Sequence, residues 1–421
     1  MDDVKGLVEA CYHCCRLAQW NMVYQLACWP VGTDQRPLYD CLEVWGQHQS
    51  QITIFEALKG KLSPAVDLLC LDKLGHAHRH LGEFQQAQNY HETHLKLAQE
   101  RGDRKAEMSA YWGLSTLNNH RYEYAKKSEL SRLYCQHHYR LACDLGDRYQ
   151  QSKALCQWGR SYHQNLDFNR GLPLLKKSLE IAKEIKNQSL EVQALEELGA
   201  IHFFAGNYQK SQFYLGQAIS EKYSAHLSKD PILEIRILMT LCFNYYLSNQ
   251  INKGNLSLET VTSRCQIIND VSLELFTLNN IAVCLSQYGI DRNAAIAYSQ
   301  KALDLSLRIG FFRVAIANAG HLAVLYGLQQ STIAAKHWLK TAIALYRQHR
   351  HVLDSEGKGI FFAYVAHARW LQGQYWGLFN LVRALILLPP WSSANGRLIW
   401  RKAVATLTPP WLRSLRNSHK L

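Results

Sequence analysis

Residues 74–104 read LGHAHRHLGEFQQAQNYHETHLKLAQERGDR, and the pattern of the first fourteen of them occurs again further along the chain. Leu74–Ala87 aligns without a gap with Leu198–Ser211. Both segments have a small residue in second place, a Gly seven residues later, an aromatic residue two beyond that, and another small residue three further on. Self-similarity of this kind indicates a repeat architecture rather than a single irregular core.

The small residue of this motif recurs at a nearly constant period. The spacings between successive copies are 40, 44, 40, 43, 40, 41 and 43 residues. The eight positions are Gly75, Ser115, Gly159, Gly199, Cys242, Ala282, Ala323 and Ala366. A bulky side chain would separate two antiparallel helices where they cross, so a crossing point favours a small residue. The period therefore predicts eight consecutive helical hairpins.

Helical signals continue between these positions. Residues 171–186, GLPLLKKSLEIAKEIK, carry apolar residues at helical spacing. Gly102-Asp103 and Gly146-Asp147 each combine a residue that ends a helix with one that begins the next. Only nine prolines occur, so long helices are permitted almost everywhere. We expect an all-α fold, a solenoid of antiparallel helix hairpins.

Three regions follow from composition and repeat quality. The 421 residues are 48% apolar and 19% charged. This apolar content is enough to build a sizeable core, and it excludes a chain that is disordered along its whole length. Residues 1–66 are expected to form degenerate hairpins, and residues 67–388 a solenoid of about eight repeats. Residues 389–421 form a tail that contains Trp, Pro and basic residues.

The motif in residues 74–104 resembles the tetratricopeptide repeat family, in its longer variety of about 40 residues. The resemblance covers residues 71–388 and weakens after Gly310. It implies a right-handed superhelix whose inner face holds peptides or protein segments. The usual Pro at the repeat end is missing. The whole chain also resembles the C-terminal repeat region of cyanobacterial multidomain proteins, in which a nucleotide-switch domain precedes such repeats.

The resemblance also implies which residues face a bound segment. In this family the first helix of each hairpin lines the inner face, at positions three before, one after and four after the small residue. The residues transferred in this way that we select as a peptide-binding groove are Asp72, His76, Arg79, Trp112, Asn119, Arg160, His163, Glu196, Phe203, Phe243, Tyr246, Asn279 and Trp370. The aromatic members are suited to anchoring apolar side chains.

Positive charge is concentrated at the end of the chain. The net charge is +13, yet no acidic residue follows Glu356, and the nine basic residues from Gly357 onward leave only +4 for the rest. Three interpretations of residues 389–421 remain open: a cap or disordered end, a surface for an anionic membrane or acidic protein, and a nucleic-acid contact. The first is favoured, and nucleic acid is least favoured because no recognised binding motif is present.

Metal and catalytic motifs are weak. Cys11-Tyr12-His13-Cys14-Cys15 lacks a second half that would complete four ligands. His91 and His94 lie three apart on a helix and could share a metal, but no Asp, Glu or Cys at ligand spacing accompanies them, so solvated or groove-lining roles are favoured. Cys135 and His138 are too close in sequence for a catalytic pair. We expect no metal, no cofactor and no enzyme.

These observations together predict a non-catalytic scaffold or adaptor that binds a protein or peptide. A regulatory receptor for a signalling peptide is the alternative within the same fold. The N-terminus, Met1-Asp2-Asp3, has no basic start of a secretory signal, and scattered single cysteines are typical of a reducing compartment, so a cytoplasmic location is expected.

Overall fold

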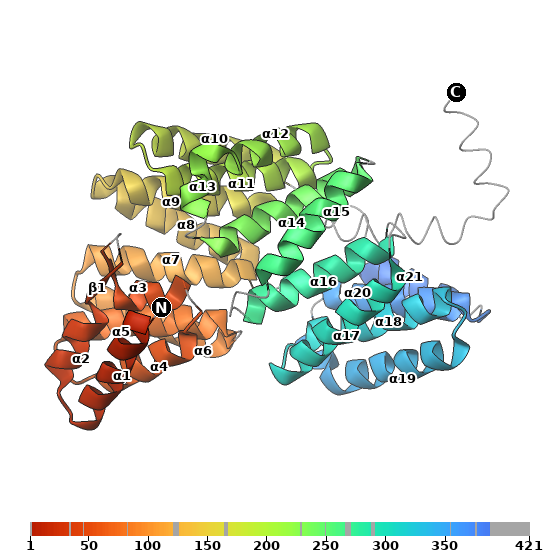
Figure 1. Ribbon diagram of the computed structural model, residues 1–421, viewed down its shortest axis with the longest axis horizontal. Coiled ribbons are helices and arrows are strands. Elements are labelled where there is room, and N and C mark those ends of the chain that lie inside the picture. Colours follow the sequence, from red (N-terminus) through yellow and green to blue (C-terminus); the bar gives the residue numbers. More distant parts are fainter. Residues whose placement is uncertain are drawn as a thin grey trace. The chain divides into compact units, whose positions relative to one another are not determined.

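The computed structural model describes twelve stretches of the chain (Figure 1), namely residues 2–32, 35–44, 46–81, 83–120, 126–163, 167–227, 230–248, 250–265, 271–287, 291–353, 355–374 and 377–387. The described residues divide into two compact units, one up to Glu274 and one from Leu275 onward. The predicted tail, residues 389–421, lies outside the described residues.

The first unit opens with short elements that pack on the first repeat. They are α1 (Asp2–Arg16), α2 (Trp20–Ala27), α3 (Leu38–Val44), α4 (His48–Leu58) and a two-residue pair of antiparallel strands, β1 (Pro30–Val31) and β2 (Arg36–Pro37). Their core contains Leu38 and Phe55, fully buried together with Leu74 of the first repeat. These elements therefore cover the end of the repeat array.

Five hairpins follow in the same unit. They are α5 (Pro64–His80) with α6 (Phe84–Glu100), α7 (Arg104–His120) with α8 (Lys126–Asp144), α9 (Arg148–His163) with α10 (Phe168–Glu184), α11 (Gln188–Phe204) with α12 (Tyr208–Ala218), and α14 (Pro231–Leu247) with α15 (Ile251–Cys265). A short extra helix, α13 (Glu221–Leu227), stands between α12 and α14. The hydroxyl of Tyr223 on α13 donates to Glu191 of α11 over 2.6 Å, which holds the insertion against its hairpin.

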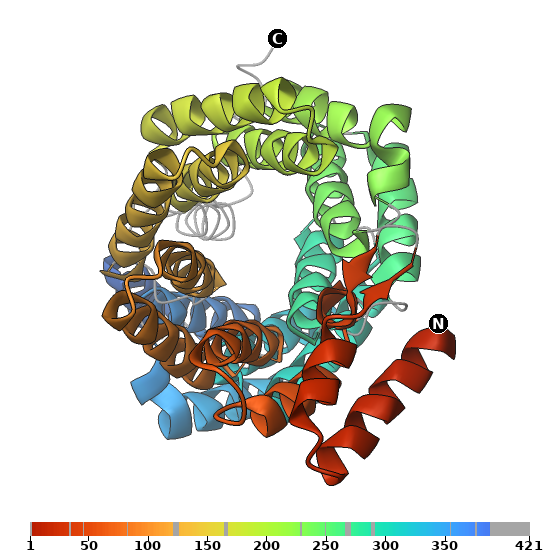
Figure 2. The ribbon, with the colours of Figure 1, turned by 90° about the vertical axis from the view of Figure 1, so that its left-hand side faces the viewer.

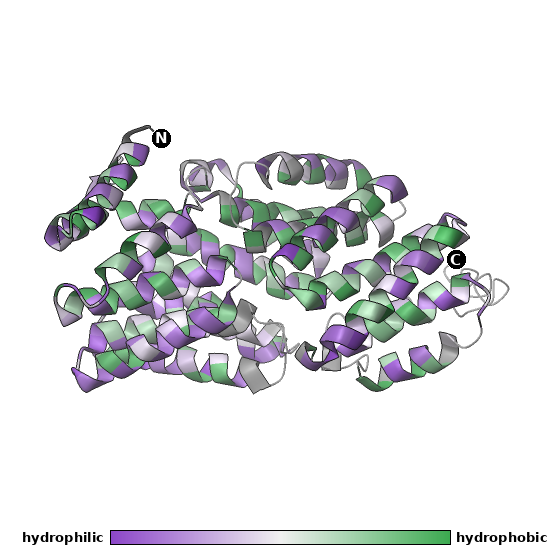
Figure 3. Ribbon diagram, turned by 90° about the horizontal axis from the view of Figure 1, so that it is seen from below, coloured by the Kyte–Doolittle hydropathy of each residue, from purple (hydrophilic) through white to green (hydrophobic). Residues whose placement is uncertain are grey.

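The second unit contains the remaining helices, and the unit boundary falls within α16. They are α16 (Val271–Gln287), α17 (Arg292–Arg308), α18 (Phe312–Leu328), α19 (Thr332–His349), the single 3₁₀ turn η1 (Arg350–Val352), α20 (Ser355–Leu371) and α21 (Gly377–Leu387). Hydropathy alternates along individual helices, as Figure 3 shows, which is the pattern of helices with one buried side.

All eight small residues lie where the sequence predicts them, buried on the first helix of a hairpin. The close approach is clearest at Gly199, where an added Cβ would stand 2.4 Å from Cγ of Leu215 on α12. Gly159 meets Leu175 of α10 in the same way, at 2.6 Å. The prediction of an all-α solenoid of helix hairpins is confirmed.

The predicted joints between hairpins also appear. Gly102 and Gly146 adopt φ of +66° and +67°, a left-handed conformation that glycine tolerates and that ends α6 and α8. The side chain of Asp103 then accepts from the backbone N–H of Ala106 over 3.0 Å, and Asp147 from that of Gln150 over 3.0 Å. Each Asp thereby satisfies an N–H group that the first turn of a helix leaves unpaired.

Among the described residues, none of the helices has both the length and the apolar character needed to cross a bilayer.

Candidate functional site

The first helices of the hairpins in unit one contact each other in succession, α5 with α7, α7 with α9, α9 with α11, and α11 with α14. Figure 2 shows these hairpins following a curved path from α5 to α15. We call the side chains that join these first helices at the predicted groove positions the inner face of this unit.

Three of the polar contacts between successive first helices share one spacing. Ser109 donates to Asp72 Oδ1 over 2.8 Å, Lys153 Nζ lies 4.0 Å from the ring centre of Trp112, and Arg236 Nη2 donates to Glu196 over 2.5 Å. In each contact one partner is a predicted groove residue, which lies three positions before the small residue of its own repeat. The other partner lies six positions before the small residue of the next repeat. Sequence reasoning missed the second set, Ser109, Lys153 and Arg236, although their common offset was available as a signal.

At the start of the inner face, α5 and α6 bring together Asp72, His76, His91 and His94. Asp72 Oδ1 lies 3.7 Å from His76 Nε2 and 3.8 Å from His94 Nδ1. The expectation that no acidic group accompanies His91 and His94 was wrong, because Asp72 reaches them from the neighbouring helix rather than along their own. Arg79, from the same predicted set, is half-buried.

Trp112 forms the next group with His138 and Lys153. The His138 ring meets Trp112 edge-on, with centroids 5.7 Å apart, and its Nε2 lies 3.0 Å from the side-chain oxygen of Gln150. Burial lowers the pKa of Lys153 to about 8. Burial, aided by the charge of Lys153, also lowers the pKa of His138 to about 3, so this imidazole is neutral in the fold.

We expect His138 to make the stability of the chain depend on pH. An unfolded histidine has a pKa near 6.5, whereas the folded one has a pKa of about 3. Between these values the unfolded chain binds the extra proton, so the stabilisation is complete above about pH 6.5 and is lost as the pH falls, by up to about 1.4 kcal/mol per pH unit. Urea unfolding at pH values from 7 to 4.5 measures the free energy of unfolding. This free energy should fall less steeply with decreasing pH in His138→Leu than in the natural chain, by a slope that corresponds to about one proton. Parallel profiles would contradict this assignment.

The third group is a buried network of four charges. Glu196 and Glu197 on α11 are 4% and 3% exposed, and Arg236 of α14 donates to both, over 2.5 and 2.7 Å. Arg160 Nε of α9 lies 3.4 Å from Glu197 Oε1. Burial raises the pKa of Glu196, against the attraction of Arg236, and the neighbouring Glu197 adds to the increase.

Two aromatic side chains lie further along α11 and α14. The rings of Phe203 and Phe243 are 6.2 Å apart, and both residues are only half-buried. The structure places the third predicted aromatic residue elsewhere. Tyr246 is 4% exposed, its ring contacts Gly254 of α15, and its hydroxyl donates to Asn255 over 2.7 Å. Because Gly254 has no side chain, Tyr246 fills the space inside its own hairpin.

The other predicted groove residues are separate from these groups. Asn279 and Trp370 belong to the second unit, where Asn279 accepts a hydrogen bond from Asn318 over 3.1 Å and Trp370 is half-buried. The side chains of Asn119 and His163 lie outside the described part of the structure.

Two of the cysteines in the weak sequence motifs, Cys11 and Cys135, are buried. Burial raises the pKa of Cys135 to about 12, and burial followed by the neighbouring thiols raises the pKa of Cys11 to about 12. In these surroundings both thiols are protonated at neutral pH.

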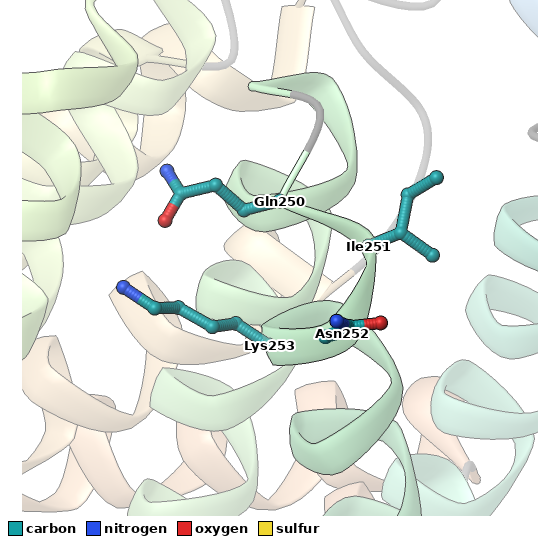
Figure 4. Close-up of a pocket in the computed structure, with 4 residues that line it drawn as sticks. All are labelled: Gln250, Ile251, Asn252 and Lys253. Atoms are coloured by element: carbon teal, nitrogen blue, oxygen red, sulfur yellow. The ribbon is translucent and has the colours of Figure 1, made fainter.

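A surface depression lies at the start of α15, lined by Gln250, Ile251, Asn252 and Lys253. In Figure 4 Gln250 and Lys253 extend to one side, and Ile251 and Asn252 to the other, so these side chains do not converge on one point.

Neither a family model nor a curated protein matches this chain. Solved structures do. A Rap protein in complex with competence and sporulation factor is 12% identical, with a TM-score of 0.54 over 84% of this chain and 99% of that one. A STAND protein with a tetratricopeptide repeat sensor, from Pyrococcus horikoshii, is 15% identical, with a TM-score of 0.53 over 84% of this chain. This chain has a fold of the tetratricopeptide repeat type. It spans about half (52%) of the Pyrococcus chain.

Proposed function

We propose that this chain is a non-catalytic adaptor that binds an extended protein or peptide segment along the inner face of its first unit. The observation that carries the proposal is the half-buried pair Phe203 and Phe243, which lies on the same two helices as the network around Arg236. An apolar anchor beside a charged group is the usual arrangement of a peptide-recognition surface.

The helix geometry sets the spacing that a ligand needs. Phe203 follows Glu196 by seven residues on α11, and Phe243 follows Arg236 by seven on α14. Seven residues of α-helix rise about 10.5 Å. An extended peptide covers that distance in about three residues. We therefore expect an acidic residue and an apolar residue three positions apart in the bound segment.

The greater exposure of the two arginines in the network favours an acidic partner. Arg160 and Arg236 are 21% and 28% exposed in their side chains, whereas the two glutamates are almost fully buried. A ligand therefore meets the guanidinium groups first. A ligand carboxylate could accept charge-assisted hydrogen bonds from these groups.

A regulatory receptor for a signalling peptide is the alternative use of the same face. It is favoured by the shared fold with the Rap protein that was solved in complex with competence and sporulation factor. The resemblance to the repeat regions of cyanobacterial multidomain proteins also suggests a role beside a nucleotide-switch domain. A cytoplasmic location stays part of the proposal. An anionic-surface or nucleic-acid role of residues 389–421 is supported by the sequence alone.

An array of extended peptides tests both the adaptor function and the receptor function. Peptides with an acidic residue three positions from an aromatic or aliphatic residue should bind, and peptides with Lys in place of the acid, or with the two residues adjacent, should not. Binding of short free peptides would favour the receptor, and binding only of longer protein segments would favour the adaptor. Equal binding of all peptides would contradict the proposed face.

Phe203→Ala and Phe243→Ala are each expected to weaken peptide binding at least tenfold, because a truncated aromatic anchor costs about 1–2 kcal/mol or more. Fluorescence polarisation with a peptide selected from the array measures the change. Phe213→Ala on α12 is the matched control, since this Phe is 59% exposed and lies outside the inner face. The same loss in all three variants would show that the aromatic pair has no specific role.

A further inference from the structure

The cluster of Asp72 with three histidines is built like a metal site. One ligand atom from each of Asp72, His91 and His94 lies within 4.8 Å of the other two. His76 Nε2 lies 3.7 Å from Asp72 Oδ1, and its ring meets that of His91 with centroids 5.0 Å apart. In a tetrahedral site with bonds of about 2.0–2.1 Å, ligand atoms stand about 3.4 Å apart. Small side-chain rotations would bring Asp72, His91 and His94 to an ion, and His76 lies beside them.

The histidines are buried and their ring nitrogens lack partners. His91 is 0% exposed and His94 is 2% exposed. Both ring nitrogens of His91, Nδ1 of His94 and Nδ1 of His76 make no hydrogen bond among the described residues. A buried polar atom without a partner costs about 1–3 kcal/mol. A bound ion would satisfy several of these atoms at once.

The other repeats show that packing at the position of His91 does not require a histidine. Sixteen residues after the small position, four of the eight repeats carry leucine, at Leu175, Leu215, Leu258 and Leu339. Leu175 and Leu215 fill the space against Gly159 and Gly199. His91 fills the same space between Gly75 and Gly113, where an added Cβ would stand 2.5 Å and 2.3 Å from its ring. A polar ring has replaced an apolar side chain at a core position, beside a carboxylate.

Neighbouring polar groups orient the carboxylate ligand. The ammonium group of Lys73 lies 3.7 Å from Asp72 Oδ2. Ser109 donates to Asp72 Oδ1 and orients it, as outer-shell groups do in metal sites.

We propose that Asp72, His91 and His94 bind a zinc ion, with His76 as the fourth ligand. Three nitrogen donors and one oxygen donor suit Zn²⁺, whereas Mg²⁺ and Ca²⁺ prefer oxygen. Because all four groups are at most 9% exposed, the site is closed. A closed site with four protein ligands is structural, and this one links α5 to α6 at the beginning of the inner face. The proposal is independent of what the inner face binds.

The test uses the full chain, kept reduced and freed of metal by chelation. Calorimetric titration with ZnCl₂ should show one ion per chain, and Co²⁺ in its place should give the visible absorption of a tetrahedral site, which Zn²⁺ then removes. His91→Leu restores the residue of the other repeats and should keep the fold while weakening Zn²⁺ binding about 100-fold or more. Asp72→Asn keeps the shape of the side chain and should weaken binding at least tenfold.

Two controls separate this site from other ligands. His138→Leu removes a buried histidine outside the cluster and should leave Zn²⁺ affinity unchanged. Cys14→Ser combined with Cys15→Ser should also leave it unchanged. The proposal is overturned if the natural chain binds no Zn²⁺, if His91→Leu and Asp72→Asn bind it as tightly as the natural chain, or if only the cysteine variant loses it.

Discussion

Arg236→Met is expected to lower the free energy of unfolding of the first unit by about 3–5 kcal/mol, because it leaves Glu196 and Glu197 buried without their shared partner. Methionine fills most of the volume of the arginine stem, so the loss is electrostatic rather than a cavity effect. Deprived of Arg236, whose attraction lowers the pKa of Glu196, the carboxyl will take up a proton at a higher pH than in the natural chain. The destabilisation should therefore grow as the pH is raised.

Urea unfolding followed by circular dichroism measures this change. Arg264→Met is the matched control, because Arg264 pairs with Glu234 at 3.4 Å with its own side chain 49% exposed, and such a pair contributes at most about 1 kcal/mol. A triple variant, Glu196→Gln with Glu197→Gln and Arg236→Met, removes the buried charges together and should recover most of the lost stability. If Arg236→Met lowers the free energy of unfolding no more than Arg264→Met does, the network is not the buried charge cluster described above.

Gly199→Leu is expected to destabilise the chain by about 3 kcal/mol, through overpacking at a helix crossing. The first atom of the new side chain would stand 2.4 Å from Cγ of Leu215 and 2.5 Å from its Cδ2, so α11 and α12 must separate. The gain in helix propensity on replacing glycine, less than about 1 kcal/mol, is too small to offset this.

Gly216→Ala on α12 tests the steric explanation directly. An added Cβ at Gly216 meets nothing within 4 Å, so only the propensity gain remains and stability should rise by about 0.5–1 kcal/mol. Thermal unfolding of the two variants should therefore shift in opposite directions. A shift in the same direction would mean that the small residue at position 199 does not mark a tight crossing.

The repeating part of the fold could be predicted from the sequence because its causes are local and periodic. A small residue at each crossing, and a Gly-Asp pair such as Gly102-Asp103 between hairpins, act within a few residues of themselves. The irregular parts were missed for the same reason. The helix α13 interrupts its repeat without a distinctive local signal, and its place is explained by the contact with Glu191 and by the burial of Tyr223 and Leu227.

The site could be predicted less well, because its contacts join residues that are far apart in sequence. Asp72 meets His94 across a hairpin, and Glu196 meets Arg236 across a repeat. The family resemblance implied single positions on the first helices and gave no partners for them. Tyr246 occupies one of those positions, but its ring packs against Gly254 of α15, where the missing side chain leaves space for it. One signal of the histidine cluster was present in the sequence, because His91 occupies a core position at which four of the eight repeats carry leucine.

The contacts between neighbouring first helices have an evolutionary consequence. Ser109 with Asp72, Lys153 with Trp112, and Arg236 with Glu196 are couples, each shared by two adjacent modules. A change in one member leaves the other unmatched, so a substitution is tolerated most easily when both members change together. The hairpin of α7 and α8 belongs to two of these couples, through Ser109 and Trp112, and its duplication would copy half of each.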